Sequence, residues 1–391
     1  MRAREMPSLL AAARRIAAEV TRPAAASVDR DARFPREAFA ALREERLLAA
    51  VLPLQLGGCG CSLTDISAIC SVLGRACSST AAIFAMQQVQ LACIARYFAG
   101  ARFFDAYLRE AAEQQWLIAS GASEIGVGGD VRTSIAAIER KGDRFSLRKK
   151  CSILSYAEEA DAILITSRRA AEAPAGDQIM TLLRKGDYRL ERLSTWDALG
   201  MRGTCSLGFD VMAEASTEQI LPEGFRAIAM QTFIPYSCIT WSAGWLGIAE
   251  EAVAIARSLV RREAGKRAGV APLGAPRLAH AVHELELMRA SVHAAAAEHD
   301  RLQSDSASAS TLASAAYALR VNGLKLTSAQ LVVRICLTSL EACGVPGYLN
   351  DSPFSLGRLI RDALAAPLMI GNDRLLATNA HLLLVGKDDV R

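Results

Sequence analysis

Residues 341–374 read EACGVPGYLNDSPFSLGRLIRDALAAPLMIGNDR, and this stretch decides the fold that we expect for the chain. A turn that contains Gly344 and Gly347 separates two segments in which apolar residues recur at helical spacing. Helices that are joined by a short turn pack as antiparallel neighbours. The stretch therefore predicts two long helices, at about 308–344 and 352–386, that share a core.

Helical periodicity also extends from this pair toward the N-terminus. Two more long helices are expected at about 236–264 and 274–302. Four long helices with short connections are typical of a bundle in which neighbouring helices run antiparallel. Residues 223–391 are therefore expected to form a C-terminal four-helix bundle.

The remaining part of the chain divides into a helical region and a β-rich region. Residues 1–115 show helical periodicity, and Ser62 with Asp65 offers good capping residues for one helix start. Over residues 116–222 the apolar pattern changes to short β-rich runs between turns such as Lys141-Gly142-Asp143. We expect an α+β protein that is mostly α, with an N-terminal helical domain, a small central β-barrel or sandwich, and the C-terminal bundle. This order is unlike a βαβ dinucleotide-binding fold.

Composition and charge exclude several classes of protein. The 391 residues carry 45 basic and 41 acidic side chains, and the net charge of +4 is too small to indicate nucleic-acid binding. No run approaches the ~18 consecutive apolar residues of a membrane span, and the basic, amphipathic start is read as a first helix rather than a targeting segment. The ten cysteines include no Cys-x-x-Cys pair. They predict reduced thiols in a cytoplasmic protein.

Two other candidate sites find little support in the sequence. His280 and His283 lie three residues apart beside Glu284, but no third metal ligand occurs at a suitable spacing. A helix surface explains this pair better, so we predict no metal site. The serine, histidine and acidic residues include no nucleophile-elbow motif, and hydrolysis by a catalytic triad is not indicated.

Several motifs, taken together, resemble those of one enzyme family. They are LPLQLGGCGCSLTD (52–65), SEIGVGGD (123–130), WDALGMRGTCS (196–206), EACGVPGY (341–348) and LIRDA (359–363). Taken alone, the glycine-rich SEIGVGGD is weak evidence, because such glycines let backbone amides approach a phosphate but also form ordinary turns. In their order and spacing the motifs resemble the acyl-CoA dehydrogenase superfamily over nearly the whole chain, from about Phe34 to Leu384. The resemblance implies that family's fold and an FAD cofactor.

The resemblance also assigns individual residues to the cofactor. The implied FAD-binding residues are Ser123, Gly128, Gly129, Ser155, Trp196, Thr204, Arg261, Gly344 and Asn372. Ser123 would bond the pyrimidine edge of the flavin, Ser155 would face its N5 edge, and Asn372 would touch the pyrophosphate. Arg261 and the Gly344 turn would complete the FAD site of a neighbouring subunit, which implies a homodimer or a homotetramer.

Three departures from the family pattern fall within the implied FAD site, two at the adenine-side glycine turn and one at a residue that usually packs by the flavin. The family's glutamine before the glycine turn is Glu341, its second glycine is Val345, and a usual aromatic residue is Ala264. An acid beside a pyrophosphate is unfavourable unless a cation offsets it. These changes leave room for a weaker site or for a contact made elsewhere.

The residue that defines the family's reaction is absent. Dehydrogenation of a thioester needs a carboxylate within ~3 Å of the proton on the α carbon. The resemblance places this acid either at Ile370 or at Ser237, and neither side chain can act as such a base. The two positions, together with Tyr236 and Cys238, are implied to line the substrate pocket.

Three functions remain open at this point. In the first, which we favour, the chain is a flavin-dependent oxygenase, because that chemistry needs a dry, sheltered flavin more than a strong base. In the second it dehydrogenates an acyl group on CoA or on a carrier protein, with the base relocated to Asp351 or Asp373, which otherwise are solvated acids. In the third it is a non-catalytic homologue that binds flavin. The substrate is expected to be an acyl thioester or a related small organic molecule, with oxygen or an electron-transfer flavoprotein as the redox partner.

Overall fold

The computed structural model describes residues 6–266 and 270–385, and its first part is helical, as expected. The helices of this part are α1 (Met6–Ile16), α2 (Arg22–Arg30), α3 (Arg36–Glu44), α4 (Leu63–Ala76), α5 (Ser78–Tyr97) and α6 (Arg102–Gln114). α4 begins with a reciprocal capping box between Ser62 and Asp65, in which each side chain accepts a hydrogen bond from the other residue's amide. α5 is buried along most of its length, and the buried residues include Gln87, Gln88 and Gln90. The first five residues of the predicted first helix lie outside the described range.

Within the described residues, eight strands form two four-stranded sheets in the middle of the chain. The strands are β1 (Ile118–Gly121), β2 (Ile138–Lys141), β3 (Arg144–Cys151), β4 (Ala162–Arg168), β5 (Gln178–Arg184), β6 (Tyr188–Arg192), β7 (Phe209–Ser216) and β8 (Ile220–Gly224). One sheet has the order β1-β4-β5-β8, with β1 parallel to β4 and the other pairs antiparallel. The other sheet has the order β2-β3-β7-β6 and is antiparallel throughout.

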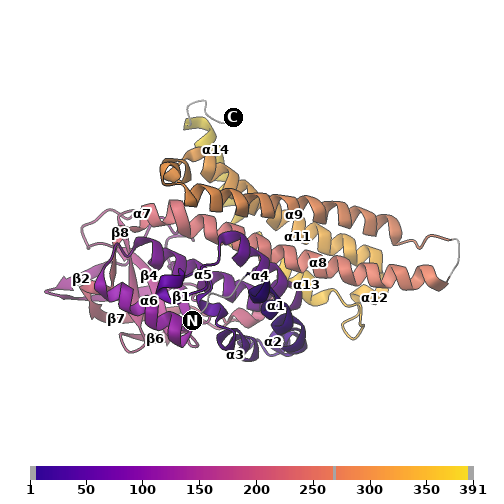
Figure 1. Cartoon of the computed structure of the whole chain (residues 1–391), viewed down its shortest axis with the longest axis horizontal. Coiled ribbons are helices and arrows are strands. Elements are labelled where there is room, and N and C mark those ends of the chain that lie inside the picture. Colours follow the sequence, from indigo (N-terminus) through magenta and orange to yellow (C-terminus); the bar gives the residue numbers. More distant parts are fainter. Residues whose placement is uncertain (1–5, 267–269, 386–391) are drawn as a thin grey trace.

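Helices make up the rest of the described chain. They are α7 (Phe225–Ile228), α8 (Ile234–Lys266), α9 (Ala275–Ser304), α10 (Ala309–Leu312), α11 (Ala315–Cys343), α12 (Val345–Tyr348), α13 (Gly357–Ala363) and α14 (Asn372–Val385). Figure 1 shows α8, α9 and α11 packed side by side along the length of the molecule, with the sheets at one end. α14 projects from the bundle.

One apolar core runs through all three parts of the chain. The helices α4 and α8 approach each other closely. A Cβ atom on Gly74 would lie 2.3 Å from the carbonyl oxygen of Gly244, and one on Gly247 would lie 2.2 Å from that of Ser71. The two backbones are therefore in direct contact, and glycine at these positions fixes the N-terminal helices against the bundle.

The predicted helix over residues 352–386 is wrong, because the structure divides it into α13 and α14. Pro367 lies between the two helices, and proline removes a backbone donor and restricts the residue before it. Ile370 and Gly371 then adopt positive φ angles of 53° and 43°, which no helix contains. Ile370, one of the two positions that the resemblance assigns to the base, therefore lies on a turn rather than on a helix.

α11 is the one helix of the described residues whose length and composition would suit a membrane span. Its most apolar 18-residue window is 61% buried inside the protein. The helix packs against both α8 and α9 in the bundle. This position in the core accounts for its apolar sequence.

Candidate functional site

The loop that follows β1, which contains Gly126, Gly128 and Gly129 and which we call the glycine loop, carries the first group of predicted flavin residues. Gly126, Gly128 and Gly129 adopt positive φ angles of 98°, 59° and 81°, which glycine reaches without steric cost. Arg374, in the first turn of α14, donates a hydrogen bond to the carbonyl oxygen of Gly128. Its Nη2 atom lies 3.7 Å from the place that a Cβ atom on Gly128 would occupy. An open loop backbone beside a guanidinium group is suited to binding a phosphate.

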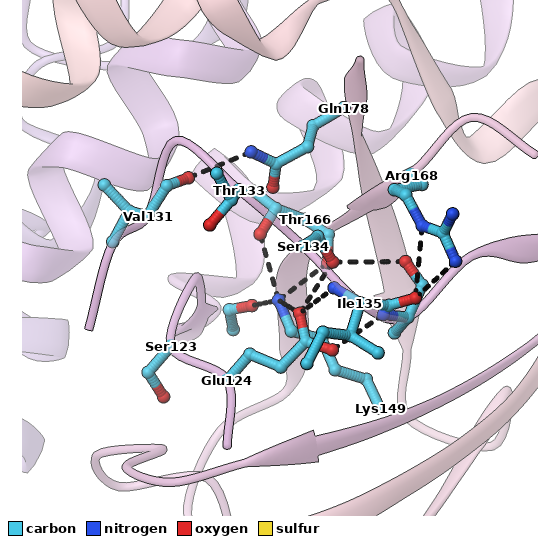
Figure 2. A network of polar contacts seen from close by, with 12 residues as sticks. Ser123, Glu124, Val131, Thr133, Ser134, Ile135, Lys149, Thr166, Arg168 and Gln178 are labelled. Carbon is cyan, nitrogen blue, oxygen red and sulfur yellow. Dashed lines mark hydrogen bonds and ion pairs between the residues drawn. The ribbon is translucent and has the colours of Figure 1, made fainter. Parts of the chain in front are cut away.

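A buried ion pair holds the base of this loop (Figure 2). Glu124 lies in the loop and Lys149 on β3, with 3.9 Å between the carboxylate and the amino group. Glu124 also accepts hydrogen bonds from the hydroxyl of Ser134 and from the two backbone amides that follow it. Lys149 donates to Thr166 and to the end of β1, and its burial lowers the pKa of the amino group. The network fixes both ends of the glycine loop against the sheets.

Ser123 lies next to the turn that follows β3. Its hydroxyl donates to the carbonyl oxygen of Ile153 and accepts a hydrogen bond of 3.0 Å from the amide of the same residue. Ile153 is exposed, as are Ile125 and Ile135 in the loop itself. Exposed isoleucines beside free backbone suit one face of a flat ring. No sequence pattern indicates these three residues, because an isolated isoleucine in a loop carries no recognisable signal.

Three hydroxyl groups form a chain near the same turn. Ser155 lies 2.7 Å from Ser206, Ser206 lies 2.7 Å from Thr204, and Thr204 donates to the carbonyl oxygen of Met201. The indole Nε1 atom of Trp196 donates to the same carbonyl at 3.2 Å. The structure therefore brings together Ser155, Trp196 and Thr204, and it adds Ser206, to which the sequence analysis gave no role.

The motif WDALGMRGTCS (196–206), which we call the tryptophan motif, also has a structural role, because it packs directly against α13. The amide of Met201 donates to the buried carboxylate of Asp362 at 2.7 Å. A Cβ atom on Gly200 would lie only 2.1 Å from the carbonyl oxygen of Arg361. Burial raises the pKa of Asp362. The tryptophan motif and the LIRDA motif are thus two sides of one contact, which joins the sheets to the bundle.

Neither position expected to carry the base holds an acid in the structure. Ile370 packs against a small apolar cluster inside the bundle that contains Cys238 and Tyr317. Ser237 is buried on α8 next to Cys238. Ile370 and Cys238, two of the predicted substrate-pocket residues, are therefore brought together, and their surroundings are largely hydrocarbon.

The two acids considered as a relocated base are both exposed. Asp351 lies on the loop between α12 and α13, and Asp373 lies in the first turn of α14. Asp373 does not share a helix face with Ile370, because Ile370 precedes the helix and has a positive φ angle. An exposed carboxylate keeps its hydration, so neither acid has the sheltered setting of a base that removes a proton from carbon.

A polar network inside the bundle surrounds Tyr236, the remaining predicted substrate-pocket residue. Its hydroxyl donates to the side-chain oxygen of Gln303 at 2.9 Å, and its ring meets that of His299 edge to face at 5.2 Å. His299 also contacts the hydroxyl of Tyr317. Burial lowers the pKa of His299 to about 4, so the imidazole is neutral at physiological pH.

Arg261 and Gly344 lie apart from the other predicted flavin residues. Arg261 is exposed in the last turns of α8, and Gly344 follows the end of α11 with open space around it. In Figure 1 the end of α8 and the adjoining α12 lie at the end of the molecule opposite to the sheets. The structure therefore does not bring Arg261 or Gly344 to the glycine loop of the same chain. Glu341 forms an ion pair with Arg277, which supplies the cation that an acid near a pyrophosphate requires.

Two surface cavities lie elsewhere, one beside the hydroxyl chain and the other near the start of α8. One, of about 220 Å³, is lined by Arg33, Phe34, Arg36, Tyr156, Glu158, Glu159 and Cys205. The other, of about 320 Å³, is lined by Glu223, Gly224, Arg226, Ala227, Met230, Gln231 and Ala313, close to the start of α8. Neither cavity is lined by a residue that the sequence analysis assigned to flavin or substrate, although Tyr156 and Cys205 adjoin the hydroxyl chain.

Comparison with known proteins identifies relatives over almost the whole chain. Residues 4–112 match the model of the acyl-CoA dehydrogenase N-terminal domain, and residues 223–380 match that of the C-terminal domain. The 3-sulfinopropanoyl-CoA desulfinase of Paraburkholderia xenovorans is 25% identical over 385 residues, which cover 96% of this chain and 94% of that protein. The amino sugar nitrososynthase DnmZ of Streptomyces peucetius is 28% identical over 355 residues, which cover 87% of this chain and 84% of that protein.

The fold is also shared with solved structures. FMN-bound TdsC from Paenibacillus sp. A11-2 superposes with a TM-score of 0.84, and the match covers 97% of this chain and 98% of that chain. The identity between the two is 18%, so this likeness establishes the fold alone. Helices, two small sheets and a helical bundle thus follow one another in both proteins as they do in the sequence-based expectation.

Proposed function

The chain belongs to the acyl-CoA dehydrogenase family, and from this premise we propose that it is a flavin-dependent oxygenase that acts on an acyl thioester or a related small organic molecule. The observation that carries the proposal is the absence of an acid at both positions of the family's base. Ile370 lies in an apolar cluster and Ser237 is buried, whereas Asp351 and Asp373 are exposed. A site with this composition shelters a reactive centre but does not remove a proton from carbon.

The residues around the glycine loop fit a flavin. Gly128, Gly129 and Arg374 offer backbone and guanidinium donors for a phosphate. Exposed Ile153 offers an apolar face, and the hydroxyl chain that begins at Ser155 offers a polar edge for the ring. A bound flavin supplies electron transfer to or from oxygen and the substrate, while the protein holds the ring, orients the substrate and excludes water. We propose FAD as the cofactor, with the glycine loop as the site of its phosphates.

The curated relatives include dehydrogenases as well as enzymes that are named for other reactions. Two of them are named for a desulfination and for the formation of a nitroso group. One of these names denotes a CoA thioester and the other an amino sugar, which shows that this scaffold accepts different substrate classes. A chain that has lost both base positions while keeping the phosphate loop fits such a divergence.

The arrangement of the site also supports an oligomer. Arg261 and Gly344 lie far from the glycine loop of their own chain, and apolar side chains are exposed beside them at Val345 and Tyr348. An exposed apolar patch of this kind is typical of a protein interface. We propose a homodimer or homotetramer in which one subunit's Arg261 approaches the cofactor held by the glycine loop of another subunit.

The experiment that tests the function is stopped-flow reoxidation of the chemically reduced, flavin-loaded protein by oxygen. It is carried out with FAD and with FMN, in the presence and absence of a panel of acyl-CoA thioesters. An oxygenase shows a transient absorbance that differs from both reduced and oxidised flavin and that decays faster with one substrate. Slow reoxidation without such a transient, together with anaerobic bleaching of the oxidised flavin by a thioester, identifies a dehydrogenase instead. A protein that binds neither flavin refutes the proposal altogether.

The outcome of the reoxidation experiment also indicates which redox partner the protein uses. An oxygenase needs a source of reduced flavin, which a separate reductase provides, and then consumes oxygen. A dehydrogenase passes its electrons to an electron-transfer flavoprotein. The oxygenase proposal therefore predicts turnover that depends on added reductase and on oxygen, and that is indifferent to an electron-transfer flavoprotein.

A further inference from the structure

A lysine that the sequence analysis did not single out lies at the centre of the bundle. Lys325, on α11, is fully buried, and its amino group donates a hydrogen bond of 2.7 Å to the side-chain oxygen of Asn372. The same amino group lies 5.8 Å from the centre of the Trp245 ring on α8, within the range of a cation–π contact. Among the described residues no carboxylate forms an ion pair with it. A fully buried lysine without an acid is rare, because burial opposes the charged form.

Asn372, which accepts the hydrogen bond from this lysine, directly follows a turn with an unusual backbone conformation. Asn372 is the first residue of α14 and directly follows Ile370 and Gly371, both of which have positive φ angles. A β-branched residue such as Ile370 enters this backbone region only when its surroundings hold it there. The contact between α11 and Asn372 is one of the forces that can do so.

α14 has few other attachments to the protein. Leu375 is its one buried apolar side chain among the described residues, and Leu376, Leu383 and Leu384 are exposed. Two polar contacts join the helix to α11: the bond from Lys325 to Asn372, and a bond of 2.8 Å from Asn322 to Asn379. The position of the first turn of α14 therefore depends strongly on Lys325.

The first turn of α14 in turn reaches the candidate flavin site. Arg374 lies two residues after Asn372, donates to the carbonyl oxygen of Gly128 and approaches Asp130 within 3.6 Å. A continuous set of contacts thus runs from the buried amino group, through Asn372 and Arg374, to the loop that is suited to a phosphate.

We propose that Lys325 is a positioning residue for the flavin site, which holds Asn372 and thereby keeps the Ile370 turn and Arg374 in place against the glycine loop. This inference rests on the proposed function only in its reference to flavin. Lys325 does not touch the reacting atoms in this arrangement. It acts through the two residues that it positions.

The strength of the hydrogen bond from Lys325 to Asn372 depends on pH, because the amino group of Lys325 can lose its charge. Burial lowers the pKa of Lys325 to about 8. The titratable group that acts on it from α8 is Cys238, whose own pKa burial raises to about 12, and α14 contributes its uncharged first residue, Asn372. A charged donor binds an amide oxygen more strongly than a neutral one. The contact is therefore strongest below pH 8 and weakens as the pH rises above it.

The test compares Lys325→Met with Lys185→Met, which replaces an exposed lysine in the turn between β5 and β6. The first readout is amide hydrogen exchange of peptides that cover residues 367–376, measured on the full chain without flavin at pH 7. We expect exchange to accelerate at least tenfold in Lys325→Met and to stay unchanged in Lys185→Met. Equal exchange in the two variants would overturn the proposal, whether or not the protein binds flavin.

The second readout is the dissociation constant of FAD and of FMN between pH 7 and pH 9. We expect the native protein to bind flavin at least fivefold more weakly at pH 9 than at pH 7, and Lys325→Met to bind weakly at both. Asn372→Asp keeps the lysine and gives it a counter-charge, so its pH transition should move to higher values. If Lys325→Met does not fold, this second variant decides the matter, because an unshifted transition contradicts the proposal. If flavin binding fails in every variant, the proposed function fails while the exchange measurement still tests the contact.

Discussion

Ile370 combines two features that are unfavourable for an ordinary surface residue. Its φ angle of 53° lies in the left-handed region, which costs a β-branched residue roughly 1–2 kcal/mol. Its hydrocarbon side chain also occupies one of the two positions at which the resemblance implies an acid. Packing against Cys238 and Tyr317 offsets part of this cost. Strain of this kind concentrates at functional sites, so the conformation of this residue links the turn to the chemistry of the site.

Ile370→Glu tests whether a base is all that the site lacks. If the site were otherwise a dehydrogenase, the new carboxylate would create bleaching of oxidised FAD by butyryl-CoA under anaerobic conditions. We expect no bleaching, because the side chain at this position packs among Cys238, Tyr317 and Val321. We expect instead a loss of about 2–4 kcal/mol in the free energy of unfolding, since a carboxyl group enters an apolar cluster.

The matched control for this prediction is Ile370→Gln, which has a similar shape without the charge. Both variants are assayed by anaerobic absorbance titration and by urea unfolding. Bleaching in Ile370→Glu that is absent in Ile370→Gln would contradict the oxygenase proposal and favour a dehydrogenase that has lost only its base.

The sequence shows that Ile370 and Ser237, the two positions that the resemblance assigns to the base, are not acids, but it did not indicate Lys325 or Arg374. Lys325 contacts a residue 47 positions away, and Arg374 contacts one 246 positions away. A single lysine or arginine in a helix usually belongs to its solvated face. Contacts over such separations depend on how the helices pack, and no local pattern reports them.

At the scale of elements, the strands that could be predicted are those that bury apolar side chains. β1, β4 and β5 are almost fully buried, and their sequences are correspondingly apolar. β2 and β6 read IERK and YRLER and are mostly exposed. Their strand conformation comes from pairing with β3 and β7 at the edges of one sheet, which a local apolar pattern does not contain.

The helix break before α14 illustrates a different limit. Apolar residues recur on both sides of Pro367, so the periodicity alone continues across it. The proline marks a probable helix boundary, but the left-handed conformation of Ile370 opposes the local preference of its residue type. The structure of the turn is therefore determined by tertiary contacts, among them the bond from Lys325 to Asn372.

The glycine loop is held as an element by the carboxylate of Glu124, and Glu124→Gln tests this role. Three donors face the carboxylate, so an amide group would turn one of its own donors toward them. The substitution of Glu124 by glutamine also leaves Lys149 buried without its counter-charge. We expect the free energy of unfolding to fall by roughly 2–4 kcal/mol, as measured by urea denaturation, and flavin binding to weaken.

Glu139→Gln is the control for this change, because Glu139 is an exposed acid on β2 in the same sheet domain. Its effect should stay within about 0.5 kcal/mol. If Glu124→Gln were as stable as the control and bound flavin equally well, the ion pair would have no part in shaping the loop.

At the scale of the whole molecule, the candidate cofactor residues divide into two groups. The glycine loop and Arg374 form one group near the sheets, whereas Arg261 and Gly344 lie at the opposite end of the bundle. The length of α8, 33 residues, separates the groups and prevents one chain from joining them. Two copies of the chain that lie side by side in opposite directions, as in a two-fold symmetric dimer, would bring both groups to the same cofactor.

Mixing two defective variants tests this arrangement directly. Gly128→Val damages the loop, because a β-branched residue is strained at a φ of 59°, and Arg261→Ala removes the distal cation. Each variant alone should bind flavin weakly. If one site takes its loop from one subunit and its arginine from the other, a mixed dimer has one site with both defects and one intact site. Co-refolding of equal amounts should then restore about a quarter of the native flavin sites, as expected for random pairing of two-fold dimers. Flavin fluorescence quenching measures the recovered fraction, and no recovery beyond the separate variants would place both residues in the site of a single chain or remove Arg261 from it.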